Sequence, residues 1–202
     1  MASTGTHQEA PAAAPPDALA LLQRDHQRVR LLFGELDILR GIDDEDERRA
    51  ELVDDICYEL TVHGTLEEEI FYPALRAATG DDDMLDEAEQ DHAGTRELIS
   101  QLEVMYPGDE HFEATIAVLA EEVEHHTAME ESEMFDAARA SSLDLVRLAQ
   151  AMAARRAELD GLDTAPDTLQ DALPGAVPGA LSDPIDAMEP HEGRRRPPRA
   201  PD

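Results

Sequence analysis

Between residues 17 and about 160, apolar side chains recur at alternating spacings of three and four residues, which is the period of an amphipathic α-helix. Four stripes of this kind follow one another along the chain. They comprise Leu19, Leu22, His26, Val29, Phe33 and Leu36; Val53, Ile56, Leu60, His63, Glu67, Ile70 and Ala74; Leu85, Ala88, His92, Thr95, Ile99, Leu102 and Tyr106; and Phe112, Ile116, Leu119, Val123, His126 and Glu130. The pattern predicts four long helices, each with one face turned towards a shared core.

The breaks between the stripes carry turn-forming residues. Residues 41–44, 79–81 and 107–109 each combine a glycine, which can end a helix, with an aspartate, which can cap the next one. Because these connections are short, neighbouring helices are expected to run antiparallel. The sequence therefore predicts an all-α fold, an up-down antiparallel four-helix bundle. An alanine-rich segment at residues 143–159 predicts a fifth, C-terminal helix, whose packing position the pattern leaves open.

Proline is concentrated at the two ends of the chain, and only Pro73 and Pro107 lie between residues 17 and 158. Because proline is costly inside regular structure, this distribution predicts three regions. Residues 1–16 are expected to be a disordered N-terminal extension, and residues 17–158 a folded helical domain. Residues 159–202, rich in Pro, Ala and Asp, are expected to be a disordered tail, and the basic cluster at residues 194–199 is interpreted as solvated charge.

Six ionisable side chains occupy stripe positions at which leucine or isoleucine is expected. They are His26, His63, Glu67, His92, His126 and Glu130. Burying so many ionisable groups is costly unless something pairs them. The arrangement also occurs twice: the Asp-His pair at residues 25–26 returns at 91–92, an offset of 66, and the His-x-x-x-Glu element at 63–67 returns at 126–130, an offset of 63. The bundle is therefore predicted to consist of two helix-pair repeats.

The spacing within each repeat has a physical reason. Residues i and i+4 lie one turn apart on one helix face, so the His and Glu of each element can converge on one point in the core, where facing helices add His26 and His92. Four imidazoles and two carboxylates are too many for one tetrahedral zinc site. They suit two metal ions bridged by carboxylates, with room for an oxo or hydroxo bridge and an exogenous molecule. Nitrogen and oxygen ligands without thiolates favour iron or manganese, with zinc as an alternative.

Two other interpretations compete with this site. A single histidine on an apolar face is usually a hydrogen-bonded core residue, but six polar groups in register and duplicated weaken that interpretation. A ferritin-like di-metal site would use the Glu-x-x-His elements at residues 89–92 and 122–125. Those elements would fall on consecutive helices, whereas the ferritin-like pattern places them on alternate helices, so the first assignment is favoured.

Several neighbouring residues have weaker claims. Asp25 and Asp91 each precede a candidate ligand histidine, and each can either orient an imidazole on a neighbouring helix or serve as a charged flank. Glu68 and Glu131 come directly after the candidate ligand glutamates and are expected to face solvent. The helical phase directs Tyr72 away from the bundle axis. Spacing identifies no dedicated acid–base residue near the metals, which weakens the case for an enzyme.

Composition and charge restrict the partners. The chain has 47 acidic residues against 16 basic ones, all of them arginine, and a formal net charge of −31. Such a chain is a poor partner for nucleic acid and for an anionic membrane surface. No apolar stretch approaches the roughly 18 to 20 residues that span a bilayer, residues 1–16 do not resemble a secretory signal, and the single cysteine, Cys57, excludes an intrachain disulfide. A cytoplasmic location is expected.

Four segments of the chain resemble the hemerythrin-like HHE cation-binding domains, a family named for its His, His, Glu pattern. These segments are LLQRDHQRVRLLFGEL, ELTVHGTLEEEIFYPAL, EAEQDHAGTRELISQL and EEVEHHTAMEESEMFDAAR, and they agree with the family in order and spacing over most of residues 17–140. The resemblance implies a hemerythrin-like domain at residues 17–158 that holds two iron ions, Fe²⁺ or Fe³⁺, without haem. It implies that the six polar residues of the stripes are the metal ligands.

The resemblance also restricts the function. Members of the family bind dioxygen reversibly, sense oxygen, iron or nitric oxide, or decompose peroxide, which implies O2, NO or H2O2 as small-molecule partners. The alternatives are a peroxide-decomposing, catalase-like di-iron oxidoreductase, and iron binding or buffering without gas chemistry. Oxygen-carrying hemerythrins have a second histidine four residues after the first on the third helix, where this chain has Arg96. A faithful oxygen carrier is therefore disfavoured.

Overall fold

The computed structural model describes residues 16–42 and 44–163, and all regular structure in this part of the chain is helical. The first helix, α1, spans Ala18–Ile38. A first long rod consists of α2 (Asp46–Leu66), the π-helical turn η1 (Glu67–Phe71) and α3 (Tyr72–Thr79). After α4 (Asp82–Leu102), a second rod consists of α5 (Phe112–Met129), the π-helical turn η2 (Glu130–Met134) and α6 (Phe135–Ala140), and α7 (Leu145–Asp163) comes last. The predicted all-α class is confirmed.

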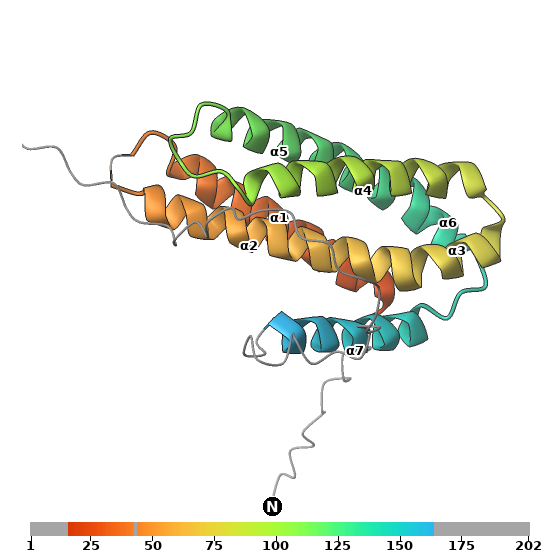
Figure 1. Ribbon diagram of the computed structural model, residues 1–202. Coiled ribbons are helices and arrows are strands. Elements are labelled where there is room, and N and C mark those ends of the chain that lie inside the picture. The colour runs from red at the N-terminus through yellow and green to blue at the C-terminus, as the bar shows by residue number, and fades with distance from the viewer. Residues whose placement is uncertain (1–15, 43, 164–202) are drawn as a thin grey trace, which may run out of the picture. The chain divides into compact units, whose positions relative to one another are not determined.

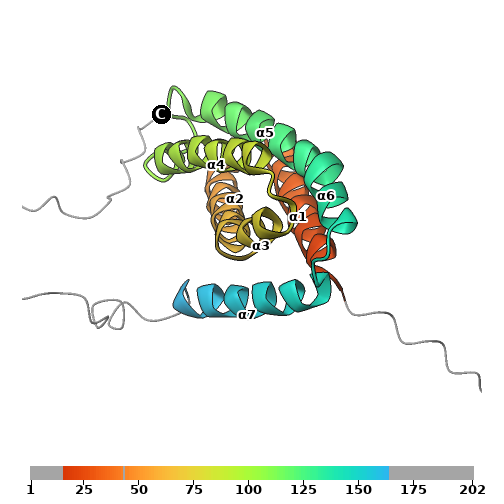
Figure 2. The same cartoon turned by 90° about the vertical axis from the view of Figure 1, so that its right-hand side faces the viewer.

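The helices form the predicted bundle. Figures 1 and 2 show α1, α2 with α3, α4, and α5 with α6 placed around a common centre. Helix α1 packs along α2, and α4 packs along α5, so that each predicted repeat is a helix pair. Helix α7 lies outside the four rods, against α1 and α2 (Figure 2). The packing position of the fifth helix, which the pattern leaves open, is therefore the α1–α2 side of the bundle.

Two of the helix starts follow from their capping residues. The side chain of Asp17 accepts a hydrogen bond from the Ala20 backbone N–H at 2.9 Å and begins α1. Gly80, with a φ of 70°, ends α3, and Asp81 caps α4 by accepting from the Met84 backbone N–H at 3.3 Å. At residues 107–109 the expected cap is not made, because the Asp109 carboxylate accepts from the Tyr106 backbone N–H inside the loop.

Two buried apolar clusters fill the bundle, and the six polar stripe residues lie between them. The first cluster contains Leu19, Leu22, Leu66, Leu85 and Phe135 among others, and reaches Ala149 and Met152 on α7. The second contains Val29, Leu36, Ile56, Ile99 and Leu119 among others. Along α1, α4 and the second rod, a histidine separates residues of one cluster from residues of the other, and in the first rod the change falls between Leu60 and Val62, next to His63. A polar layer is thus enclosed on both sides by packed apolar side chains.

The C-terminal boundary differs slightly from the prediction. Helix α7 continues to Asp163, whereas the folded domain was predicted to end at residue 158. The helix passes through Gly161 because a single glycine costs a helix only about 1 kcal/mol relative to alanine. The rest of the predicted tail and residues 1–15 lie outside the described residues. Within the described residues, no helix is both long enough and apolar enough to cross a membrane.

Candidate metal centre

The structure brings together all six polar residues of the stripes. His26 comes from α1, His63 from α2, Glu67 from η1, His92 from α4, His126 from α5 and Glu130 from η2. All six are buried, and the two glutamates have no exposed surface. Imidazole and carboxylate groups are rarely this deeply buried without a compensating partner. Whether the six bind metal stays a prediction, but their convergence is a structural fact.

The inner atoms of the cluster are the imidazole Nε2 atoms and the glutamate oxygens. His63 Nε2 lies 3.1 Å from Glu67 Oε2, and His92 Nε2 lies 3.4 Å from the same oxygen. His26 Nε2 and His126 Nε2 lie 3.3 and 3.5 Å from Glu130 Oε2. The two glutamates therefore each stand between histidines of different helix pairs, as bridging carboxylates would.

Two overlapping groups of these atoms have the compactness that a metal ion requires. One comprises His26, His63, Glu67 and Glu130, and the other comprises Glu67, His92 and His126; in each, the offered ligand atoms lie within 4.8 Å of one another. Four of the inner atoms are buried without any hydrogen-bond partner, namely Nε2 of His26 and of His63, Oε1 of Glu67 and Oε2 of Glu130. Buried lone pairs with no donor fit cations, so the residues present match a pair of metal ions.

Each histidine has a carboxylate near its outer nitrogen, Nδ1. The distances are 2.8 Å for His26 to Glu131, 3.8 Å for His63 to Asp25, 2.9 Å for His92 to Glu68, and 3.4 Å for His126 to Asp91. A carboxylate at Nδ1 favours a proton there and leaves the Nε2 lone pair facing inward. Of the two roles open to these aspartates, the hydrogen bond of Asp91 supports the orienting one, whereas Asp25 places its charge beside His63 at a distance longer than a hydrogen bond.

The expectation that Glu68 and Glu131 face solvent is wrong. Their side chains are about one-third exposed, at 33% and 29%, and each turns back to a histidine of a facing helix. The sequence repeat could have indicated a shared role for these two residues, because they are related by the same offset of 63 that relates the two candidate ligand glutamates. Their partners, His92 and His26, are likewise related as the single histidines of the two repeats.

The π-helical turns overturn the expectation for Tyr72. In an ideal α-helix residue i+5 points about 140° away from residue i. In η1 the Tyr72 N–H instead bonds to the Glu67 carbonyl five residues back, and in η2 the Phe135 N–H bonds in the same way to Glu130. The wider turn carries both aromatic rings onto the inner face, where each is at most 1% exposed. Ile70, which the stripe placed inside, is only half-buried.

Tyr72 brings a hydroxyl group to the centre of the cluster. Its O–H donates to Glu130 Oε1 at 2.8 Å, and its oxygen lies 3.4 Å from Glu67 Oε2 and 3.3 Å from His92 Nε2. Burial, together with the negative charges of Glu67 and Glu130, raises the pKa of Tyr72 well above its usual value. The phenol therefore keeps its proton at neutral pH.

The second repeat has a different group at the equivalent place. The Phe135 ring stacks on His26 with the ring centroids 6.1 Å apart and the planes 12° from parallel. It also meets Phe71 edge-on. The His92–His126 half of the cluster therefore has a phenol beside it, whereas the His26–His63 half has an apolar ring. Repeat symmetry holds for the six candidate ligands and breaks at this position.

Charge couples the cluster in the metal-free state. Burial disfavours the ionised forms, but mutual contact overrides it: the pKa of Glu67 is held well below its usual value by His63 and His92, and the pKa of His63 is raised well above its usual value by Glu67 and Asp25. Protonated imidazoles thus offset the carboxylate charges where metal ions would otherwise do so.

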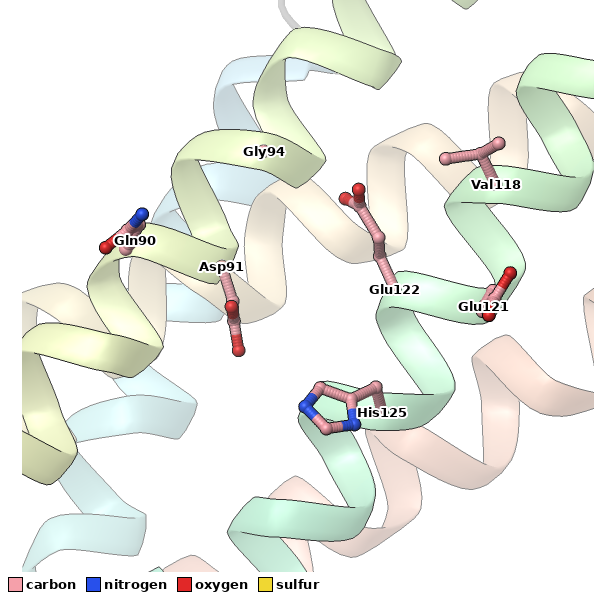
Figure 3. A pocket seen from close by; sticks show the side chains of 7 residues that line it. All are labelled: Gln90, Asp91, Gly94, Val118, Glu121, Glu122 and His125. Atoms are coloured by element: carbon pink, nitrogen blue, oxygen red, sulfur yellow. The ribbon is translucent and has the colours of Figure 1, made fainter.

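The ferritin-like alternative does not match the geometry. Glu122 and His125 lie on the surface of α5, and with Asp91 they line a pocket of about 560 Å³ between α4 and α5 (Figure 3). Glu89 is paired with Arg76, at the surface. Figure 3 shows Asp91 and Glu122 projecting into the space between the two helices. Arg96, where oxygen carriers have a histidine, is exposed and pairs with Glu68.

A buried His and Glu cluster at the centre of a helical bundle defines a cation-binding helical domain. This chain belongs to the Hemerythrin HHE cation binding domain family, whose model matches residues 17–138. The predicted family is thereby confirmed.

Two known proteins are similar to the chain. One is a crystal structure of a Hemerythrin HHE cation binding domain-containing protein from Mycobacterium kansasii, which matches with a TM-score of 0.62 and 24% sequence identity. The match covers 73% of this chain and 89% of that chain. At this identity the similarity concerns the fold. A DNA nickase from Nostoc sp. is 29% identical over 119 residues, which are 59% of this chain and 32% of that protein. The match thus spans about a third of the nickase.

Proposed function

We propose that this chain is a non-haem di-iron protein that binds or responds to O2, NO or peroxide at the site of four histidines and two glutamates. The observation that carries the proposal is the set of buried inner atoms of His26, His63, Glu67 and Glu130 that have no hydrogen-bond partner. Such atoms are costly to bury in an apolar enclosure unless positive charge offsets them, and a pair of metal ions would supply that charge. Manganese and zinc remain alternative metals for the same donors.

The residues have separate roles in this proposal. His26 and His63 would hold one ion, and His92 and His126 the other, with Glu67 and Glu130 shared between them. When bound, such ions supply open coordination positions and redox chemistry for a small molecule. Tyr72 would donate a hydrogen bond towards a guest beside His92, and Phe135 and Phe71 would exclude water on the opposite side.

Peroxide decomposition is a second candidate that one observation favours. Spacing identified no acid–base group near the metals, but the structure places the Tyr72 phenol in contact with both candidate bridging glutamates. A protonated group at that position can deliver a proton to a departing oxygen. Iron buffering without gas chemistry would have no use for such a group.

The Nostoc relative is named a DNA nickase, but nothing in this chain supports a DNA-nicking activity. Only about a third of that protein is matched, and the net charge of −31 repels a polyanion. We therefore propose small molecules as the partners, and a cytoplasmic location in keeping with the single buried cysteine, Cys57.

Iron content and spectroscopy test the proposal. The purified chain should carry about two iron ions, and His63→Ala should lose most of them because it removes an inner ligand. His125→Ala, a change of the adjacent exposed histidine of the His126 element, is the matched control and should keep its iron. Full iron retention in His63→Ala would contradict the site. Anaerobic reduction followed by O2, NO or H2O2 then separates the functions: a reversible visible spectrum supports binding, repeated turnover of peroxide supports catalysis, and no reaction supports buffering.

A further inference from the structure

Three of the four carboxylates at the outer nitrogens of the histidines are themselves paired with an arginine. The pairs are Glu131 with Arg30, Glu68 with Arg96, and Asp25 with Arg156. Asp91 pairs with no arginine within residues 16–42 and 44–163. Arg30 and Arg96 belong to bundle helices, α1 and α4. Arg156 alone comes from α7, outside the four rods, so it links the fifth helix to the candidate metal centre.

Arg156 joins two bundle helices beneath α7. Its Nη2 atom lies 2.6 Å from Asp25 Oδ2 on α1, and its Nη1 atom lies 3.2 Å from Glu59 Oε2 on α2. Asp25 and Glu59 are 18% and 19% exposed, and Arg156 is 27% exposed, so water screens these contacts less than it would at an open surface. The guanidinium therefore holds the Asp25 carboxylate at a defined place.

The Asp25 carboxylate lies beside His63, one of the candidate metal ligands. Asp25 Oδ2, the oxygen that Arg156 contacts, lies 3.8 Å from His63 Nδ1. His63 Nδ1 is buried and has no hydrogen-bond partner, and Asp25 is the carboxylate nearest to it in the described part of the chain. At 3.8 Å this contact is longer than a hydrogen bond, so Asp25 acts on the His63 ring through its negative charge, and Asp25 in turn has Arg156 as its counter-charge.

The neighbouring arginine provides a comparison on the same helix. Arg155 makes two contacts with Glu69 on η1, at 2.7 and 3.1 Å. Glu69 contacts none of the four histidines. Ala149 and Met152 of α7 are buried in the cluster that also contains Leu19 and Leu66. Both arginines thus accompany the docking of α7, but only Arg156 reaches a carboxylate that faces a candidate metal ligand.

We propose that Arg156 is a positioning residue for His63, through which the docking of α7 sets the metal affinity of the His26–His63 half of the centre. Without the guanidinium, the partly exposed Asp25 carboxylate would turn towards water, and the negative charge beside the buried Nδ1 of His63 would be lost. Loss of such an outer partner typically weakens metal binding by about 10- to 100-fold. The His92–His126 half has no such link to α7. This inference rests on the proposed di-iron function.

Iron release from variants of the full chain tests it. Wild type, Arg156→Gln, Arg156→Lys and Arg155→Gln are loaded anaerobically with Fe²⁺, and release to a strong chelator is followed by absorbance. In Arg156→Gln, one of the two irons should leave about 10-fold faster or more, and Mössbauer spectra of the loaded chain should change for one iron only. Arg155→Gln should behave as wild type. Arg156→Lys keeps the positive charge but loses the planar guanidinium that contacts two carboxylates, so its rate of iron release should be intermediate.

A second variant covers the case in which Arg156→Gln does not fold, as judged by circular dichroism. Asp25→Asn keeps the shape of the side chain and should reproduce the faster release, and the double variant should add nothing further. Unchanged or slower release in both variants, or equal acceleration in Arg155→Gln, would overturn the positioning role while leaving the di-iron function standing. A wild-type chain that takes up no iron would overturn the proposed function itself.

Discussion

At the scale of single residues, the centre depends on which nitrogen of each imidazole faces inward. All four histidines direct Nε2 to the shared glutamates and Nδ1 to an outer carboxylate. Because the same arrangement occurs at all four, the inner lone pairs are available without any rearrangement of the rings. The one inner group without a counterpart in the other repeat is the Tyr72 hydroxyl.

Tyr72→Phe tests the role of that hydroxyl. Phenylalanine should fit, since Phe135 fills the equivalent place in the second repeat, and iron content should stay near wild type because the six candidate ligands remain. Glu130 Oε1 loses its donor, which should cost the metal-free chain about 1–3 kcal/mol. If the phenol supplies a proton, the rate of peroxide decomposition by the loaded chain should fall about 100-fold.

The control for this change is Tyr106→Phe, which removes a hydroxyl from a side chain that is 52% exposed. It should leave iron content, stability and peroxide kinetics unchanged. Stopped-flow measurement of peroxide loss, with thermal unfolding of the metal-free protein, provides both readouts. An unaltered peroxide rate in Tyr72→Phe would remove the observation that favours the enzymatic candidate.

At the scale of the helical elements, the two π-helical turns decide how the chain continues after each candidate ligand glutamate. The second residue after the first turn is a proline, Pro73, whereas Asp136 stands at the equivalent place after the second turn. Both turns nevertheless form. Proline is therefore not their cause, and the two repeats share instead an aromatic residue five positions after the glutamate that packs into the core.

Deletion of Ser132 should convert η2 to α-helix. Phe135 would then stand four residues after Glu130, still on the inner face, and His126 and Glu130 precede the deletion. The chain should therefore stay folded and keep its iron. Deletion of Glu121, an exposed residue in the regular part of α5, rotates everything after it by about 100°. Several buried side chains would leave the core at about 1.5–3 kcal/mol each, so this control should unfold.

Circular dichroism and thermal unfolding distinguish these two deletions, and iron analysis shows whether the centre survives. Cooperative unfolding and iron content near wild type are expected for the Ser132 deletion. Loss of helical structure in that variant, to the same degree as in the Glu121 deletion, would show that the π-helical turn is itself required for packing.

At the scale of the whole molecule, charge is distributed unevenly between the outside and the core. Of 47 acidic residues in the sequence, two, Glu67 and Glu130, have no exposed surface in the described part of the chain. Apart from the four carboxylates at the outer nitrogens of the histidines, the others set solubility and repel anions. The buried pair is offset by imidazolium groups in the metal-free protein, so pH and metal are expected to act on the same residues.

The stability of the metal-free chain should therefore depend on pH with a definite sign. The raised pKa values of His63 and His92 stabilise the fold below the ordinary imidazole value of 6.5, and this stabilisation is lost as pH rises through the raised values. The lowered pKa of Glu67 stabilises the fold above 4.5, and this stabilisation is lost as pH falls. The chelator-treated protein should thus unfold at its highest temperature between about pH 4.5 and 6.5.

Iron loading should abolish the decline above that window, because the metal ions replace the protons as counter-charges. Thermal unfolding in high salt, which screens the surface charge, is the appropriate measurement. A metal-free chain whose unfolding temperature rises steadily from pH 6 to 9 would contradict the coupling of His63 and His92 to Glu67.

The amino-acid sequence alone specifies the helices, the repeat and the six converging residues, because each depends on a local period that the chain must obey. The 3.6-residue turn puts His63 and Glu67 on one face wherever the helix packs. The same period misplaced Tyr72, because a π-helical turn widens the helix before that residue and the sequence pattern does not reveal it. Glu68 and Glu131 were misplaced because their partners, His92 and His26, lie on facing helices. The periodicity of the sequence could not predict the contacts of Arg156, since the α-helical pattern of residues 145–163 is compatible with many docking positions. It is tertiary packing, which buries Ala149 and Met152 against α1 and α2, that brings this arginine to Asp25 beside a candidate metal ligand.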